Sequence, residues 1–262
     1  QIGLTALGYS RVYSLLRPTM KIDHWIGSMY AVMNTFSELQ KLGIDVGKLY
    51  DEDDGSASFV EDKLCGGSAP AAMPNGEKVD KDKVAEYVGI FRELRHREGY
   101  EVLFQTLMEE VGRKEKDIKG RSGELNLAYE RQEPWAIKIF RKMVTDCLTG
   151  VQQTLETYNV RHDSFDFESE LGWEGSNQIF LQLLRESNYF VPQTQKNDKG
   201  VPEGAYLNMK AFIKDAGLPT GKKGYMKDYP NLYVLRPDGS TLYTFRDIVY
   251  SFKKASQSDL VL

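Results

Sequence analysis

Apolar residues recur at helical spacing in three long stretches of the chain, and this pattern predicts three amphipathic helices. The first helix runs from about His24 to Gly43, where glycine ends it. The second covers Val84 to Gly112, and the third extends from Pro134, a favourable first residue for a helix, to about Tyr158. A shorter helix over residues 178–187 has Ser176 or Asn177 as its candidate cap, and another follows residue 244.

Other segments carry the pattern of strands. The chain is expected to open with the last turns of another helix, which stops at Gly8. A strand from Arg11 to Leu16 should follow it. Phe165 and Phe167 alternate with acidic residues, and this period of two predicts a short strand. Residues 231–244 form a predicted hairpin around a Pro-Asp-Gly turn, and residues 260–262 start a last strand. Strands that alternate with long helices predict an α/β fold with a mostly parallel sheet.

Between the strand-bearing parts lies a stretch whose pattern is helical and polar. We predict a first part of the α/β domain at residues 1–50, a largely helical insertion at 51–133, and the rest of the α/β domain at 134–262. Residues 66–83, rich in Gly, Ala, Pro and charge, are expected to form a flexible loop within the insertion. Residues 113–126 are interpreted as a polar bridge to the next segment, and the charge run at 113–121 as a solvated helix end more readily than an RNA contact.

Composition narrows the class of protein. The 262 residues carry a formal net charge of -4 and a sequence pI near 5.6, so no overall basic charge points to nucleic acid. The apolar runs are far shorter than a membrane span. Cys65 and Cys147 lack metal-ligand spacing, and we interpret them as reduced thiols of a cytoplasmic protein. The three histidines have no paired spacing either, so no metal site is expected.

Candidate chemistry gathers where the hairpin passes into the last helix. Tyr243 and Asp247 are four residues apart, so in a helix both side chains face one side. A phenol and a carboxylate at that place suit a planar cation such as guanidinium. The alternative is structural: Asp247 would complement the helix dipole in the first turn, and Tyr243 would belong to the core. Two weaker candidates are the basic, aromatic loop 221–229 as an RNA contact and the acidic stretch around Glu168 and Glu170, whose simplest interpretation is a solvated strand edge.

Three segments resemble one family in the correct order. The stretch VLRPDGSTLYTFRDIVYSF is similar to the Arg-Ser-Asp-Gly-Thr-x-x-Tyr-x-Thr-Arg-Asp-Ile segment of class I arginyl-tRNA synthetases. KIDHWIGSMYAVMNTF resembles the family's Asp-His-Phe-Val-Gly-x-x-Tyr-Val segment, and KMVTDCLTGVQQTLETYNVRHDSFDFESEL resembles its long helix and the stretch after it. The matching positions in the first segment are Arg236, Asp238, Gly239, Ser240, Tyr243, Arg246, Asp247 and Ile248.

The resemblance implies a partial doubly wound (Rossmann-like) parallel sheet. It also implies activation of L-arginine by ATP with Mg²⁺, followed by transfer to tRNA. It implies that Tyr243 and Asp247 bind the substrate guanidinium, and that Asp238, Gly239 and Arg246 position this pocket. Two family motifs, His-Ile-Gly-His and Lys-Met-Ser-Lys-Ser, do not occur in the chain, and Pro237 and Phe245 depart from the family's Ser and Thr. The chain is therefore expected to be an internal fragment of the catalytic domain that is inactive alone.

Two further interpretations stay open at the level of sequence. A non-catalytic, arginine-binding or regulatory paralogue would keep the pocket without the ATP-binding motifs. A plain interaction module of helices on a sheet would bind no arginine at all. The sequence does not set an oligomeric state, and it gives no sign of a membrane partner.

Overall fold

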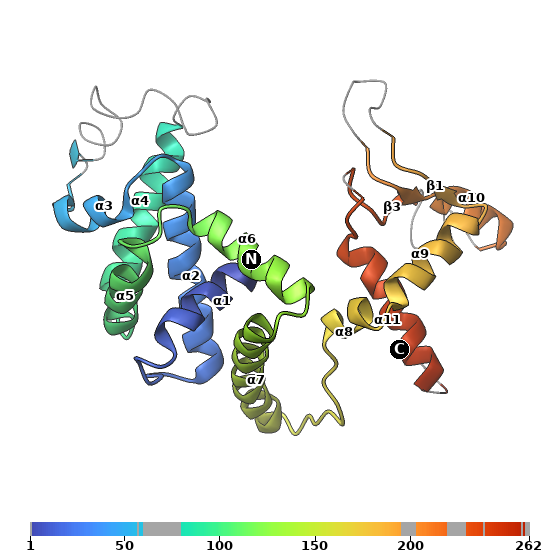
Figure 1. Cartoon of the computed structure of the whole chain (residues 1–262), viewed down its shortest axis with the longest axis horizontal. Helices are drawn as coiled ribbons and strands as arrows, with labels where there is room; N and C mark the ends of the chain where they lie inside the picture. Colours follow the sequence, from blue (N-terminus) through green and yellow to red (C-terminus); the bar gives the residue numbers. More distant parts are fainter. Residues whose placement is uncertain are drawn as a thin grey trace. The chain divides into compact units, whose positions relative to one another are not determined.

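The computed structural model describes residues 2–56, 58–59, 80–194, 203–218, 229–237, 239–257 and 259. The chain divides into two compact units, Gln1–His162 and Asp163–Leu262 (Figure 1). Cys65, the turn residue Asp238, the predicted strand at 260–262 and all of the loop 221–229 except Tyr229 lie outside the described residues. So does most of the predicted flexible loop, although its last three residues already belong to a helix.

All regular secondary structure in the described part of unit 1 is helical. The three predicted helices are confirmed in type, because α2, α4 and α7 cover the expected stretches, although the second stretch is broken between α4 and α5. Pro134 is the first residue of α7, as predicted. The elements are α1 (Ile2–Val12), α2 (Ile22–Lys41), α3 (Val46–Glu52), α4 (Lys81–His96), α5 (Glu101–Leu107), a π-helical turn η2 (Met108–Gly112), α6 (Ile118–Glu130) and α7 (Pro134–Thr157).

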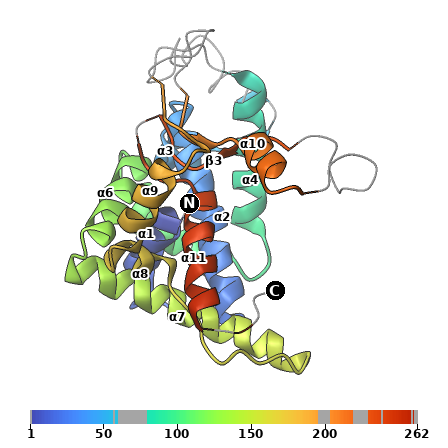
Figure 2. The ribbon, with the colours of Figure 1, turned by 90° about the vertical axis from the view of Figure 1, so that its right-hand side faces the viewer.

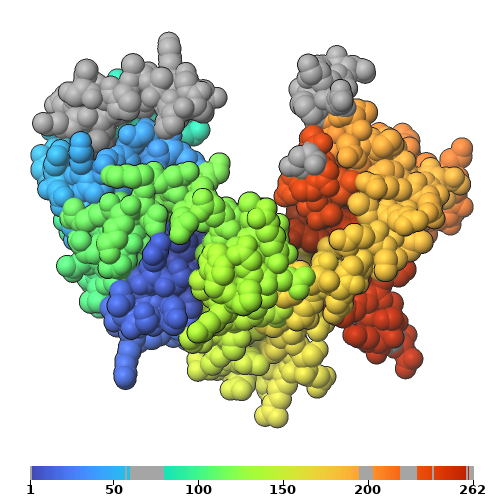
Figure 3. Space-filling view, viewed as in Figure 1, coloured from blue at the N-terminus to red at the C-terminus, as the bar shows by residue number. Residues whose placement is uncertain are grey.

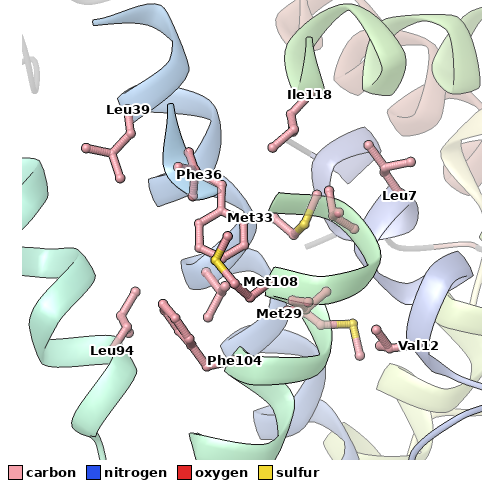
Figure 4. Packing of buried hydrophobic residues seen from close by; sticks show 14 of the residues in the cluster. Leu7, Val12, Met29, Met33, Phe36, Leu39, Leu94, Phe104, Met108 and Ile118 are labelled. Atoms are coloured by element: carbon pink, nitrogen blue, oxygen red, sulfur yellow. The ribbon is translucent and has the colours of Figure 1, made fainter. Parts of the chain in front are cut away.

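One apolar core holds these helices together, and α2 lies at its centre. Phe36 on α2 meets the ring of Phe104 edge-on at 5.5 Å, and Phe91 of α4 lies 5.2 Å from Phe104. Figure 4 shows Met29, Met33 and Met108 filling the space between these aromatic rings and α1. Flexible thioether side chains suit such irregular gaps. Residues from all seven described α-helices of unit 1 belong to this single core.

Three of our predictions in unit 1 are wrong. The expected stop at Gly8 and strand at 11–16 are replaced by α1, which continues to Val12. Gly8 serves packing instead: a Cβ there would lie 2.8 Å from Cγ of Met33, so its absence lets α1 approach α2 closely. The expected polar bridge contains α6, which Asp117 caps by accepting a hydrogen bond from the amide of Gly120. Only four residues of α6 are buried, too sparse a stripe to be recognised: Ile118, Ser122, Leu125 and Ala128.

Unit 2 combines helices with a small sheet. Strands β1 (Phe190–Val191), β2 (Tyr206–Leu207) and β3 (Leu232–Tyr233) pair antiparallel in the order β1-β2-β3. The helices are α8 (Glu168–Trp173), α9 (Ser176–Glu186), α10 (Met209–Asp215) and α11 (Tyr243–Gln257). Figure 2 shows α11, in red, passing α8 and α9, the two helices against which it packs. Gly175, at φ 81°, precedes α9, so neither Ser176 nor Asn177 caps it as we predicted.

The sheet differs from the expected one. Within the described residues all strand pairs are antiparallel, and the parallel doubly wound sheet is not found. The strand predicted around Phe165 and Phe167 is wrong as well. The backbone at Phe167 is extended, but the residue belongs to none of the described strands, and α8 begins at the next residue. Alternation therefore identified an extended segment without identifying a partner strand.

Candidate functional site

The candidate site begins with the predicted hairpin, which the structure confirms. Leu235 and Thr241 form an isolated antiparallel bridge. The amide of Arg236 donates to the carbonyl of Ser240 at 2.8 Å, and the amide of Gly239 donates to the carbonyl of Arg236 at 2.9 Å. Gly239 adopts a φ of 84°, a conformation that glycine reaches without steric cost, so it makes the turn that we assigned to it.

The base of the hairpin is fixed to the segment before β2. The carbonyl of Ala205 accepts hydrogen bonds from the amides of Val234 (2.9 Å) and Leu235 (3.2 Å). Gly204 passes so close that a Cβ there would lie 2.0 Å from the carbonyl oxygen of Leu235. The hydroxyl of Thr244 donates to the carbonyl of Tyr233 at 3.0 Å, which ties the start of α11 to β3. The hairpin and the first turn of α11 are therefore positioned as one piece.

Helix α11 presents Tyr243 and Asp247 on its exposed side. Phe245 and Val249 are buried on the other side, in a small core with Leu171, Ala205, Val234 and Leu235. Tyr243 is the first residue of the helix and its side chain is 67% exposed, so the alternative that placed it in the core is wrong. Asp247 is exposed and lies one turn later, and no acidic residue occupies the first turn, so the dipole alternative fails too. Both side chains are available to a ligand.

The segment before and within α8 contacts α11 through charged and polar groups. Nε of Arg246 lies 3.0 Å from Oε1 of Glu168, and the phenol of Tyr250 donates to Oδ2 of Asp166 at 2.9 Å. This hydrogen bond, together with partial burial, raises the pKa of the Tyr250 phenol above its ordinary value. From the sequence alone, the role of Glu168 stayed undecided, and Asp166 and Tyr250 were not recognised as candidates. The Asp-Phe-Glu alternation was the available signal, because it places two carboxylates on one side of an extended segment.

The described residues contain no group of three or more His, Cys, Asp or Glu arranged to hold a metal ion. Cys147 is a half-buried thiol on α7, and its pKa is raised by desolvation and by the nearby Asp23 carboxylate. None of the described helices is long and apolar enough to cross a bilayer.

Comparison with known proteins gives one consistent result. The chain is 32% identical to the arginine–tRNA ligase of Saccharolobus solfataricus over 97% of its own length and 35% of that protein. It is 28% identical to the arginine–tRNA ligase of Sulfolobus acidocaldarius and 26% identical to that of Korarchaeum cryptofilum, again over 97–98% of the chain and 34–36% of each relative. No protein-family model matches the chain, and no solved structure does.

Nearly the whole length of the chain is thus related to aminoacyl-tRNA synthetases of class I. Among these enzymes the relatives are the arginine–tRNA ligases, and the resemblance found from three motifs is confirmed over nearly the entire chain. The chain spans about a third of the length of the curated relatives that it matches.

Proposed function

We propose that this chain forms the arginine-recognising part of an arginine–tRNA ligase, with Tyr243 and Asp247 as the residues that bind the substrate guanidinium. The observation that carries the proposal is the exposed pair itself: a carboxylate and a phenol one turn apart at the start of α11. Their opposite helix face is buried, so their exposure is not the result of a loosely attached helix. The relationship to arginine–tRNA ligases supplies the substrate class.

The chemistry of the pair fits a guanidinium better than it fits an ammonium. A guanidinium is planar and offers several N–H donors in fixed directions, so it can donate to a carboxylate and a phenol oxygen together. Arg246, between the two residues in sequence, points its guanidinium to Glu168 instead. It acts in this proposal as a positioning residue, as do Gly239 and Asp238 of the turn.

The proposed reaction is that of the whole enzyme: ATP-dependent activation of arginine and its transfer to tRNA. The described residues provide no carboxylate set for Mg²⁺, so no residue here is assigned to ATP or to the metal. The doubly wound parallel sheet that the family implies would be formed by other parts of such an enzyme. The three-part division at residues 50 and 133 remains a prediction about that enzyme. Because the His-Ile-Gly-His and Lys-Met-Ser-Lys-Ser motifs are absent from the 262 residues, we expect no ATP–pyrophosphate exchange by this chain alone.

Isothermal titration of the chain with arginine tests the proposal. Citrulline has nearly the same shape without the charge, and lysine has the charge without the planar group, so both should bind at least about tenfold more weakly. Asp247→Asn should weaken arginine binding by about 10- to 100-fold, because hydrogen bonds to a charged group contribute about 1.5–3 kcal/mol.

The matched control is Glu186→Gln, which removes an exposed carboxylate from the last residue of α9 in the same unit. It should leave arginine binding unchanged. A folded chain that binds arginine and citrulline equally, or loses as much affinity in Glu186→Gln as in Asp247→Asn, rules the assignment out.

A further inference from the structure

Acidic residues of the segment 163–174 meet α11 at three successive places. Glu168 contacts Arg246 at 3.0 Å, Asp166 accepts the phenol hydrogen bond of Tyr250 at 2.9 Å, and Glu174 lies 3.9 Å from Lys253. The contact partners on α11 are therefore spread over two turns of the helix. The surfaces of α9 and α11, which also pack together, adjoin at the orange and red part of Figure 3.

We propose that Tyr250 and Asp166 are positioning residues that set the rotation of α11 about its own axis, and so the direction of Tyr243 and Asp247. The inference rests on the proposed function, because it concerns the binding of arginine by those two residues. Neither Tyr250 nor Asp166 would touch the substrate.

Helical geometry makes Tyr250 suitable for this role. Each residue advances the helix by about 100°, so Tyr250, seven residues after Tyr243, projects only about 20° away from it. Asp247 projects about 60° from Tyr250 on the same stripe. Tyr243, Asp247 and Tyr250 therefore form one stripe along α11. A contact that fixes Tyr250 also fixes the direction in which the two proposed ligand-binding residues project.

The hydroxyl of Thr244 ties the first turn of α11 to β3, and beyond that turn two other kinds of contact constrain the rotation of the helix less sharply. Phe245 and Val249 hold the opposite face by apolar packing, which is not directional. Arg246 is half-buried and Glu168 is exposed. Solvent screens an ion pair in that setting, and its long side chains can change conformation without breaking it. The Tyr250 hydrogen bond adds a short, directed contact, and Nζ of Lys254 lies 4.9 Å from the centre of the same ring.

The contact is also exposed, which separates positioning from stability. A solvent-exposed hydrogen bond contributes little net free energy to folding, because water takes the place of the lost partner. Losing it should therefore leave the unit folded while Tyr243 and Asp247 are held less firmly in direction. The effect is expected in ligand affinity and only weakly in the melting temperature.

Isothermal titration of the full chain with arginine tests the inference on four variants. Tyr250→Phe and Asp166→Ala should each raise Kd about two- to tenfold with unchanged stoichiometry, and the double variant should be no worse than either single one. Asp166→Asn keeps a side-chain oxygen that can accept the phenol hydrogen, so it should bind nearly as the wild type does. A purely destabilising change would instead lower the stoichiometry and leave Kd unaltered.

Tyr189→Phe is the matched control, since the phenol of Tyr189 donates to Asp215 at 3.3 Å in the same unit but away from α11. Its Kd should equal that of the wild type. If the wild type binds arginine selectively and Tyr250→Phe leaves Kd unchanged, the positioning role is rejected and the proposed function stands. If the wild type binds no arginine, the proposed function fails and the positioning role fails with it.

Discussion

Unit 1 and unit 2 stabilise their helices by different means. In unit 1, Phe36, Phe91 and Phe104 form the centre of a core to which α1, α2, α4, α5, α6 and α7 all contribute. In unit 2 the buried core of the described residues consists of Leu171, Ala205, Val234, Leu235, Phe245 and Val249. Helix α9 there has no fully buried residue, and Ile179 and Leu183 on it are more than half exposed.

The difference in core size between the two units is related to the place of the proposed binding residues. Fully burying one large apolar side chain contributes about 1.5–3 kcal/mol, so the larger core gives unit 1 more stability to lose. Unit 2 carries the proposed arginine-binding residues and adds directed polar contacts where apolar burial is small. Binding elements are commonly drawn from the less stable parts of a protein, because they must expose polar groups to a ligand.

The largest effect is expected from one truncation in each core. Phe104→Ala should cost about 3–5 kcal/mol of the free energy of unfolding of unit 1, yet leave it folded, since many neighbours remain. Phe245→Ala, of equal size, should leave unit 2 largely unfolded in native buffer because its core is small. Urea unfolding followed by hydrogen exchange of each unit measures both. If unit 2 tolerates Phe245→Ala as well as unit 1 tolerates Phe104→Ala, the comparison is wrong.

A smaller effect should follow from adding one methyl group to a glycine of each unit. Gly204→Ala places Cβ about 2.0 Å from the backbone oxygen of Leu235, and backbone cannot move aside as a side chain does. We expect a loss of about 2 kcal/mol or more from unit 2, measured by thermal unfolding. Gly89→Ala on α4 meets nothing within 4 Å and should stabilise unit 1 by about 0.5–1 kcal/mol. Equal melting temperatures for the two variants would contradict the close approach at Gly204.

The smallest effect concerns charge and acid pH in unit 1. The side chain of Asp53 is 3% exposed, and Nη2 of Arg92 lies 2.6 Å from its Oδ1; this hydrogen bond holds the pKa of Asp53 below its ordinary value. Because the pKa of Asp53 is lower in the folded state than in the unfolded state, its ion pair stabilises unit 1 fully above about pH 4. This stabilisation is lost as the pH falls through the pKa that Asp53 has in the folded state.

Asp53→Asn should therefore destabilise unit 1 by about 1–2 kcal/mol at pH 7 and by less at pH 2. Urea unfolding of unit 1 at both values checks this, with Asp82→Asn in the first turn of α4 as the comparison. If the free energies of unfolding of the wild type and Asp53→Asn differ more at pH 2 than at pH 7, the expected sign is reversed. The stabilising role assigned to the Asp53–Arg92 pair is then refuted.

Several features of this protein were determined by the sequence itself. The stripes of α2, α4 and α7 are long and regular, and helices of that kind are set by local periodicity and by residues such as Pro134. The hairpin at Gly239 follows from turn chemistry that glycine alone makes inexpensive. The spacing of Tyr243 and Asp247 fixes that they share one side of α11.

Tertiary structure decided the rest. Gly8 looked like a helix stop, and only the approach of α1 to α2 makes it an interior helix residue. Phe165 and Phe167 alternate as in a strand, but a strand needs a partner, and pairing depends on residues distant in sequence. The meeting of Asp166 with Tyr250 and of Glu168 with Arg246 joins residues about eighty positions apart. Local propensity carries no information about such contacts, because they depend on which surfaces pack after the helices have formed.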